Sequence, residues 1–290
     1  SDLSGKGLRS LLIQRIGSVL KLETREMLLL SQTIEFIHNA SLLHDDLIDR
    51  SVLRRNKPAA WVKYSPEYAV LAGDYLLARV MVNLSRYGNL ALIQLTAEVI
   101  SDLLEGEWLQ DSLIRDWDVQ LHQLDQVHVL KTASLFKWCF KAPFICRKQS
   151  ETDLISILEE AGGILGVLFQ RSDDLLDFDV RNFEGKAVLG DLRSGYLNSF
   201  GAFLSAKISA EIKSQLRQVT TMEELKNLVG IDIFESCLTE FDGMNRQLIE
   251  EYNHQLDILS EKLDAKEKSL VDDLRRLGHY LYWRAEPSRS

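Results

Sequence analysis

Two short acidic motifs of the same design lie in this chain, each within an otherwise apolar segment. The first is Asp45-Asp46-Leu47-Ile48-Asp49, and the second is Asp173-Asp174-Leu175-Leu176-Asp177. On a helix this spacing puts the first and last carboxylates one turn apart on one face, with the middle one about 100° round the axis. Carboxylates held so close repel one another unless a cation lies among them. Such oxygen ligands suit Mg²⁺, which shares its coordination with waters and substrate phosphates. Two motifs facing each other would hold a diphosphate between metal ions.

A single motif of this type is more often an ordinary solvated helix surface than a metal site. Here both motifs follow apolar runs, Ala40-Ser41-Leu42-Leu43-His44 and Gly166-Val167-Leu168-Phe169-Gln170. Cationic residues also follow both motifs closely. The pair together therefore indicates a site for metal ions and a diphosphate.

A second anionic substrate would need a positive pocket of its own, and the chain offers several candidates for it. They are Lys6, Arg9, His38, Arg54, Arg55, Lys131 with its neighbour Thr132, and Lys186. His38 lies about two helical turns before Asp45 on the same face. Each of these residues alone is more often a surface charge than a ligand. Their joint placement around the acidic motifs favours anion binding.

Apolar residues recur at three- and four-residue spacing through most of the chain, which predicts an all-α fold. The predicted helices are 8–19, 21–49, 66–87, 89–113, 119–140 and 151–180, with shorter ones from 196 on. The acidic motifs end two of these helices. The polar segments 50–65 and 181–195 are predicted loops, and Pro143 is expected to break the next helix near its start. With no linker-like stretch in 290 residues, we expect one domain, 1–290, with a sizeable core.

Composition limits the classes of partner. The net charge of −9 disfavours nucleic acid and anionic membrane as main partners. Three cysteines without a Cys-x-x-Cys pair indicate a reducing compartment, so we expect a cytoplasmic protein. Charges interrupt the first 30 residues, and no later run is long enough and apolar enough to span a bilayer. Contact with membrane is expected only transiently, through a lipid product.

These motifs together resemble the trans-isoprenyl diphosphate synthase (polyprenyl synthase) family over most of the chain. Segment 36–49 followed by 53–58 is similar to the family's first aspartate-rich motif with its arginine pair. Segment 169–178 is similar to the second aspartate-rich motif. Further similar blocks are 73–78, 131–136, 185–186 and 191–195. The first block most resembles long-chain members of the octaprenyl and solanesyl type.

The resemblance implies an isoprenoid synthase type I fold, a single large helical bundle with a central apolar cavity. It implies a Mg²⁺-dependent reaction, with about three ions per site once substrate is bound. Isopentenyl diphosphate would condense head to tail with geranyl, farnesyl or geranylgeranyl diphosphate, by ionisation, condensation and elimination. Members of the family are commonly homodimers, so a homodimer is expected here.

Carried over by position, the resemblance gives each residue a role. Metal ions would be ligated by Asp45, Asp49 and Asp173, with Asp46, Asp174 and Asp177 supporting directly or through water. The allylic diphosphate would be held by Arg54, Lys131, Thr132, Gln170 and Lys186. The diphosphate of isopentenyl diphosphate would be held by Lys6, Arg9, His38 and Arg55. The catalytic set is then the aspartates 45, 46, 49, 173 and 174 together with Lys131.

Several positions depart from the family pattern. One basic residue of the first group is replaced by Gly7, and a position that is often acidic is Arg50. Tyr196 stands where a lysine is frequent, and Asn198 stands where a threonine is common. These changes are expected to tune affinity without abolishing activity. The chain also begins almost at the first motif, whereas family members usually have more sequence there, which suggests a truncation.

Product length depends on how far the growing chain extends below the first motif. Ala40 and Ser41 lie about one turn before Asp45 and are small. In the family, aromatic residues at these positions stop elongation, so that the products are short. We therefore predict an all-trans product of C20 or longer, although Phe36 or Ile37 could form a deeper floor. Two alternatives stay open. One is a class I terpene cyclase, and the other is a non-catalytic or weakly active subunit of a heteromeric synthase.

Overall fold

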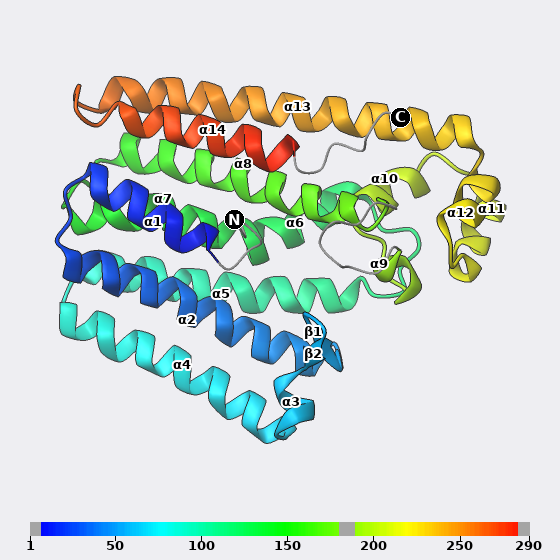
Figure 1. Cartoon of the computed structure of the whole chain (residues 1–290), viewed down its shortest axis with the longest axis horizontal. Coiled ribbons are helices and arrows are strands. Elements are labelled where there is room, and N and C mark those ends of the chain that lie inside the picture. The colour runs from blue at the N-terminus through cyan, green and yellow to red at the C-terminus, as the bar shows by residue number, and fades with distance from the viewer. Residues whose placement is uncertain (1–6, 180–188, 284–290) are drawn as a thin grey trace.

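The computed structural model describes residues 7–179 and 189–283, and in this part the chain is almost entirely helical (Figure 1). In its first half the helices are α1 (Leu8–Val19), α2 (Thr24–Ile48), α3 (Ala60–Lys63), α4 (Pro66–Tyr87), α5 (Leu90–Ser112) and α6 (Leu121–His128). A π-helical turn, η1 (Val129–Ala133), leads into α7 (Ser134–Cys146) and α8 (Thr152–Leu176). The rest comprises α9 (Gly190–Arg193), α10 (Ser199–Ser205), α11 (Ala210–Gln215), the 3-10 turn η2 (Leu216–Gln218), α12 (Met222–Val229), α13 (Ile231–Lys262) and α14 (Ser269–Trp283).

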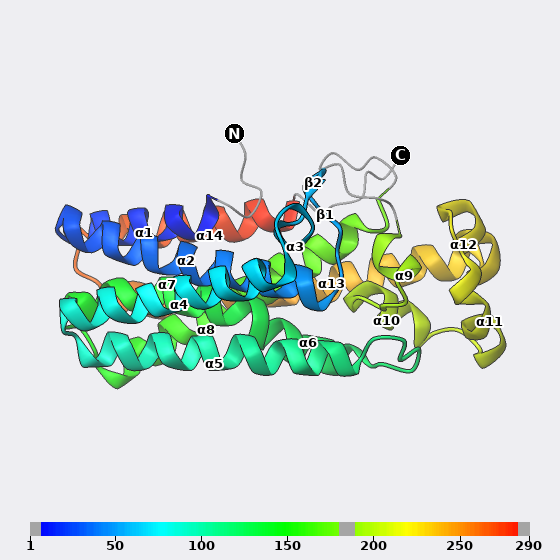
Figure 2. The same ribbon diagram turned by 90° about the horizontal axis from the view of Figure 1, so that it is seen from below.

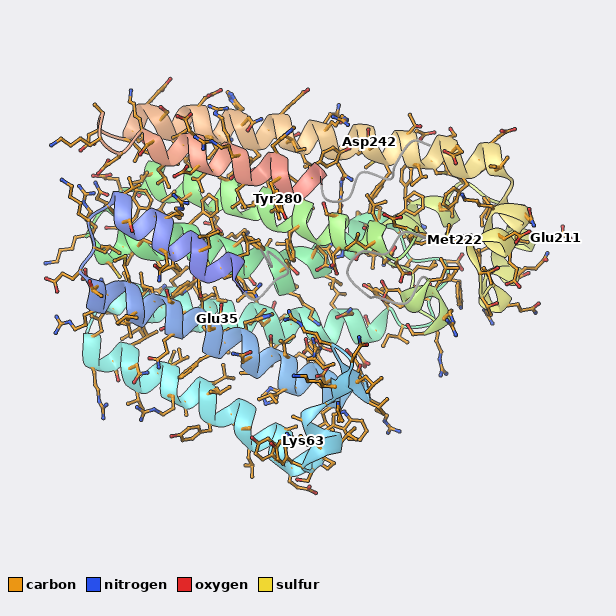
Figure 3. All side chains as sticks on the ribbon, viewed as in Figure 1. Glu35, Lys63, Glu211, Met222, Asp242 and Tyr280 are labelled. Atoms are coloured by element: carbon orange, nitrogen blue, oxygen red, sulfur yellow. The ribbon has the colours of Figure 1, made fainter. Side chains whose placement is uncertain are left out.

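The long helices form a bundle elongated along one direction. α8 packs against α7 and α13, and α2 packs against α1 and α4. α13 and α4 lie at opposite edges, while the short helices α9 to α12 gather at one end (Figures 1 and 2). Side chains fill the spaces between the helices (Figure 3). The predicted all-α bundle is therefore confirmed, and no described helix is long and apolar enough to cross a bilayer.

Local signals explain where individual helices begin and end. Ser65 accepts a hydrogen bond from the backbone of the first turn of α4, and Pro66 opens that helix, where its missing N–H costs nothing. Gly88 takes a left-handed conformation (φ 80°) that ends α4. The side chain of Asn89 then caps α5. Two long helices thus follow each other with a sharp turn between them.

Two apolar clusters stabilise the fold. The first lies among the long helices and contains large buried side chains such as Trp138, Phe136 and Phe140. The second lies towards the end with the short helices, where Phe200 contacts Phe234 and Phe241 edge to face. Leu175 and Leu189, beside the second acidic motif, belong to this second cluster. The motif is therefore built against a packed apolar base.

Four sequence-based expectations for this fold were wrong. Shorter helices were expected from 196 on, but α13, with 32 residues, is the longest described helix. The predicted loop 181–195 contains the short helix α9. The segment 50–65, predicted as loop, contains a hairpin of β1 (Leu53–Arg54) and β2 (Lys57–Pro58), followed by α3. Strands of two residues are too short to show an alternating pattern. Pro143 does not break its helix, because α7 continues through it to Cys146. Because Pro143 lies near the end of α7, it removes little more than one backbone hydrogen bond. The surrounding buried side chains hold this last turn in place.

Candidate active site

The first acidic motif lies at the C-terminal end of α2. Asp45 and Asp46 occupy its last turn, and Asp49 is the residue that ends the helix. Asp46 is 5% exposed and accepts hydrogen bonds from Arg54 at both oxygens, from Nε at 2.6 Å and from Nη2 at 2.5 Å. Such a bidentate pair neutralises one carboxylate of the three. Asp45 and Asp49 are left for other partners.

A tight hairpin positions Arg54 for this contact. Arg54 pairs with Lys57 across β1 and β2, and the two residues between them, Arg55 and Asn56, both have positive φ (51° and 61°). Two left-handed residues in a two-residue loop match the turn that favours right-twisted hairpins. The hairpin thus returns the chain over the end of α2.

The second acidic motif repeats this plan with different partners. Asp174, 5% exposed, lies in the last turn of α8, and Asp177 is the residue that ends the helix. Oδ2 of Asp174 accepts hydrogen bonds from the backbone N–H and hydroxyl of Ser199 (2.9 and 2.6 Å), and Oδ1 accepts one from Gln170 Nε2 (3.0 Å). In both motifs, then, the middle carboxylate is buried and held on both oxygens. Of the outer carboxylates, Asp177 keeps a buried Oδ2 that has no hydrogen-bond donor among the described residues.

The π-helical turn η1 joins the two motifs. Lys131 Nζ donates to Gln110 Oε1 (2.6 Å), contacts the carboxylate of Glu107, and lies 3.3 Å from Asp45 Oδ2. The next residue, Thr132, donates its hydroxyl to Gln170 Oε1 at 3.0 Å, and Gln170 in turn holds Asp174. Adjacent residues of one turn therefore reach the first and the second motif. π-helical turns of this kind are frequent at functional sites.

Two glycines make room for this turn between α5 and α8. A Cβ atom at Gly106 would lie 2.5 Å from Cγ of Lys131, and one at Gly166 would lie 2.4 Å from Cα of Ala133. Both distances are far below van der Waals contact, so a side chain at either place would displace the turn. The glycines thus set how closely Lys131 and Thr132 approach the motifs.

A cavity of about 390 Å³ opens between η1 and the second motif. Its lining residues come from α5, α6, η1, α8 and the segment around α9: Gln110, Val127, His128, Lys131, Thr132, Gln170, Asp173, Asp174, Asp177, Gly190, Asp191 and Tyr196. The lining is mainly polar, as a diphosphate would require. The central apolar cavity that the family resemblance implied stays a prediction.

The loop that closes the cavity is held by backbone and amide contacts. Gly195 (φ 86°) turns the chain, and the backbone N–H of Tyr196 donates to the carbonyl of Asp191 at 2.9 Å. Asn198 Nδ2 donates to Asp191 Oδ2 (3.1 Å) and to the carbonyl of Asp174 (3.0 Å). Asn198, where the family commonly has threonine, thus links a third acidic side chain to the second motif.

Several carboxyl groups of the site have raised pKa values. Burial raises the pKa of Asp45 to about 7, with Glu107 adding to the effect and Lys131 opposing it. Burial raises the pKa of Asp177 to about 7, with the charge of Asp191 acting in the same direction. Burial also raises the pKa of Asp174 to about 6, against the hydrogen bonds from Ser199. Carboxylates in this state would be stabilised by a bound cation.

The donor set fits a hard divalent cation. Oδ2 of Asp177 is buried with no hydrogen-bond donor among the described residues, and every candidate ligand is a carboxylate oxygen. Within the described residues no three acidic, histidine or cysteine side chains converge on one point. Magnesium is commonly held by one or two carboxylates together with substrate phosphates, so convergence of three is not required.

The predicted residues for isopentenyl diphosphate lie apart from this cavity. Arg9 on α1 is 3% exposed, and burial lowers its pKa, with the charge of Arg55 acting in the same direction. His38 lies half-buried on α2. The structure brings Arg9 and Arg55 within electrostatic reach of each other. Lys6 and Lys186 lie outside the described residues.

The two predicted chain-length residues lie on α2 before the first motif. Ala40 is fully buried, and Ser41 is half-buried with its hydroxyl donating to the carbonyl of His38 at 2.8 Å. Neither lines the cavity described above. Their effect on product length stays a prediction.

Several polar residues at the site were missed by the sequence reasoning. Glu107, Gln110 and His128 come from segments that carry no recognisable motif, and Asp191 lies in the similar block 191–195, to which no role was assigned. The spacing of Glu107 and Gln110, three residues apart on one helix next to a glycine, was the available signal. Nothing local pointed to His128.

Comparison with known proteins gives the chain its relatives. The family described as Polyprenyl synthetase matches residues 1–230. The chain is 36% identical over 204 residues to a prenyl transferase of a Synechocystis species, covering 69% of this chain and 63% of that protein. It is 35% identical over 209 residues to solanesyl diphosphate synthase 1, chloroplastic, of Arabidopsis thaliana, covering 71% of this chain and 51% of that protein. It thus spans only half to two thirds of these relatives.

The fold comparison agrees. The crystal structure of a decaprenyl diphosphate synthase from Rhodobacter capsulatus superposes with a TM-score of 0.84 at 26% identity, covering 98% of this chain and 87% of that one. Sequence and fold relate the two acidic motifs, and the helices that end in them, to one group of proteins. This chain belongs to the polyprenyl synthetase family.

Proposed function

We propose that this chain is a trans-prenyltransferase that condenses isopentenyl diphosphate with an allylic diphosphate, head to tail, to give an all-trans polyprenyl diphosphate. The observation that carries the proposal is the π-helical turn. Lys131 contacts Asp45 of the first motif, and Thr132 contacts the second motif through Gln170. A diphosphate bound in the adjoining cavity would meet a cation, a hydroxyl and an amide from one side. It would meet the acidic motifs from the other.

Each group has a task in the ionisation of the allylic substrate. Lys131, Thr132 and Gln170 hold the departing diphosphate and stabilise the charge that develops on it. Arg54, fixed against Asp46, completes the positive rim at the first motif. Lys186 is proposed from the family resemblance alone. The aspartates of the two motifs would hold Mg²⁺, proposed as about three ions per site, which would supply electrostatic stabilisation of the leaving diphosphate.

The second substrate would be held on the other side of the first motif. Arg9, Arg55 and His38, with Lys6, form the proposed site for the diphosphate of isopentenyl diphosphate. Its double bond then attacks the allylic carbon, and a proton is lost to the departing diphosphate. Water would have to be excluded during this step, because it would otherwise capture the cation as an alcohol.

We propose a product of C20 or longer. The side chains at Ala40 and Ser41 are small, and relatives of the chain carry the names solanesyl diphosphate synthase and decaprenyl-diphosphate synthase. Replacing Ser41 by Phe should shorten the product, because the new ring would fill space one turn before Asp45. Ser41 is the better position for this test, because it is only half-buried.

We further propose that residues 1–290 form one polyprenyl synthase domain that works as a homodimer in the cytoplasm. α13 lies beyond the family match and packs against α8, which carries the second motif. Exposed apolar side chains on α4 and α5, including Leu71, Tyr75 and Trp108, offer a surface for a second copy. The three cysteines are buried thiols without disulfides, which suits a reducing compartment.

One assay tests this function. The purified chain is given labelled isopentenyl diphosphate, Mg²⁺ and a C10, C15 or C20 allylic primer, and products are separated by length. We expect incorporation with products of C20 or longer, and its loss in the Lys131→Met variant. Hydrocarbon released from primer alone would indicate a terpene cyclase. No incorporation with any primer would overturn the proposal and favour the partner-subunit alternative.

A further inference from the structure

A buried arginine lies directly behind the second acidic motif. Arg171 on α8 is 5% exposed and donates through Nε and Nη2 to the carboxylate of Asp125 on α6, at 2.8 Å for the shortest contact. Its Nη1 donates to Asn245 Oδ1 at 3.1 Å, and its guanidinium carbon lies 5.7 Å from the ring centre of Phe241. A buried guanidinium is tolerated only with partners of this kind.

A buried histidine lies between Asp125 and the second motif. His128, one turn later on α6, is 4% exposed, and its Nδ1 lies 4.0 Å from Asp125 Oδ1. Its Nε2 lies 3.4 Å from Oδ2 of Asp174. The imidazole therefore lies between the carboxylate that Arg171 fixes and the middle carboxylate of the second motif, and its buried Nδ1 has no hydrogen-bond partner among the described residues.

The contact falls on the oxygen of Asp174 that faces the protein. Oδ2 already accepts two hydrogen bonds from Ser199, so with His128 it is enclosed on its protein side. Among the described residues, only Gln170 donates a hydrogen bond to Oδ1. A carboxylate oxygen has two lone pairs, so Oδ1 keeps one for a metal ion or a metal-bound water. Restricting rotation of Asp174 would keep that lone pair in one direction.

This chain of contacts is polar and largely buried, whereas the two core clusters consist of apolar side chains. A buried ion pair seldom stabilises a fold more than apolar packing of the same volume. Oriented polar contacts do, however, fix the positions of neighbouring groups. Groups behind a metal ligand typically alter metal affinity by about 10–100-fold when removed. We therefore expect its effect in ligand binding more than in stability.

The contacts also extend past the family match. Asn245 and Phe241 lie on α13, beyond residue 230, and both contact Arg171. The end of the second motif is thus tied to a helix outside the matched region.

We propose that His128 is a positioning residue. Through Asp174, and backed by Asp125 and Arg171, it sets how tightly the second acidic motif holds the metal ions and the diphosphate. This inference rests on the proposed function only in taking that motif as the metal–diphosphate site.

The test is binding of Mg²⁺ with inorganic diphosphate, measured by calorimetric titration on wild type and on His128→Leu. Leu fills a similar volume without a polar atom. We expect the variant to bind about tenfold or more weakly. His128→Gln, which keeps an N–H donor that can approach Asp174, should recover most of the affinity. In the elongation assay, His128→Leu should raise the half-saturating Mg²⁺ concentration and leave the KM for isopentenyl diphosphate unchanged.

A matched control separates positioning from general destabilisation. Thr96 is fully buried on α5 and accepts a hydrogen bond from Trp138 Nε1 at 2.9 Å, away from the cavity. Thr96→Val loses a buried hydrogen bond and should lower the melting temperature without changing the affinity for Mg²⁺ and diphosphate. Arg171→Met combined with His128→Leu should weaken binding by less than the product of the two single effects, because both act through the same contacts.

The outcomes are distinguishable. Unchanged binding of Mg²⁺ and diphosphate in His128→Leu would overturn the inference, as would an equal loss in Thr96→Val. Absence of binding in wild type would overturn it too. If wild type binds but elongates no primer, the proposed function fails while the comparison of variants still decides the role of His128.

Discussion

At the scale of single residues, the middle aspartate has the same kind of environment in both acidic motifs. The middle aspartates, Asp46 and Asp174, are both buried and held on both oxygens, by Arg54 in one motif and by Ser199 and Gln170 in the other. Among the outer aspartates, the pKa values of Asp45 and Asp177 are raised to about 7, and Asp49 is exposed. The aspartates within one motif therefore have unequal roles, and substitutions of them are expected to differ in their effects.

Proton release from the site should make metal binding depend on pH. Because the pKa values of Asp45 and Asp177 are about 7, Mg²⁺ must displace protons below pH 7. Below about pH 7, the apparent dissociation constant for Mg²⁺ should rise by about tenfold for each unit that the pH falls and for each proton that Mg²⁺ displaces. Titrations at pH 6 and 7.5 measure this. Asp45→Asn should make the dependence shallower, and a flat profile in wild type would contradict the assignment.

The same shifts predict how Mg²⁺ affects stability. Without metal, the folded chain keeps these protons up to about pH 7, whereas unfolded carboxyls lose them near pH 4. The stability from these groups is thus full below about pH 4 and is lost as the pH rises through 7. Mg²⁺ should therefore raise the melting temperature more at pH 8 than at pH 5.5. A larger rise at pH 5.5 would show the sign to be wrong.

Tyr196 stands where the family frequently has a lysine, and the substitution Tyr196→Lys tests diphosphate binding at this position. Burial raises the pKa of its phenol, with Asp174 and Asp191 adding to the effect, so the ring is neutral and faces negative charge. Tyr196→Lys would add a cation beside the cavity and should lower the KM for the allylic diphosphate by about tenfold, as expected for one charge-assisted hydrogen bond. Tyr196→Phe is the control and should change it little. A higher KM in the lysine variant would count against diphosphate binding here.

At the scale of elements, the close packing of η1 against α5 and α8 gives a sharp prediction. Gly166→Ala would place a methyl group against the backbone of Ala133, and the turn or α8 must shift. We expect a loss of about 1–3 kcal/mol in the free energy of unfolding and a lower kcat. Urea unfolding and the elongation assay measure the two effects.

Gly243 on α13 provides the matched control. A Cβ atom there meets nothing within 4 Å, so Gly243→Ala should stabilise the helix by about 0.5–1 kcal/mol and leave kcat unchanged. Equal effects of the two substitutions would rule out the packing argument.

Some of this architecture could be predicted from the sequence and some could not. The bounds of α4 were predicted as observed, because Pro66 and Gly88 mark both ends. The π-helical turn could not be predicted, because one extra residue barely disturbs a helical pattern over 119–140. The aspartates were found because their spacing is local. Ser199 and His128 were not, because their contacts with Asp174 join elements far apart in the chain.

At the scale of the whole molecule, α4 forms one edge of the bundle and leaves apolar side chains uncovered (Figure 1). Leu71 and Tyr75, one turn apart on this helix, are 67% and 65% exposed. In a symmetric dimer each substitution acts twice. The double variant Leu71→Glu with Tyr75→Glu should therefore raise the dimer dissociation constant by about a hundredfold or more. Light scattering after gel filtration measures the mass.

Leu28→Glu is the control for this prediction. Leu28 is 61% exposed near the start of α2, so a charge there should leave the mass unchanged. A monomeric wild type, or an unchanged dimer in the double variant, would remove α4 from the interface.

The π-helical turn also makes the geometry of the site sensitive to the deletion of a single residue, an effect that no substitution tests. A π-helical turn holds one residue more than an α-helical turn, so the helices on its two sides are out of register with a single continuous helix. Deleting Val129 would let α6 and α7 fuse into one α-helix. Everything before the deletion would then rotate by about 100° relative to everything after it. His128 would turn away from Asp174 while Lys131 stayed in place. The geometry of the site therefore depends on the presence of one residue in the turn.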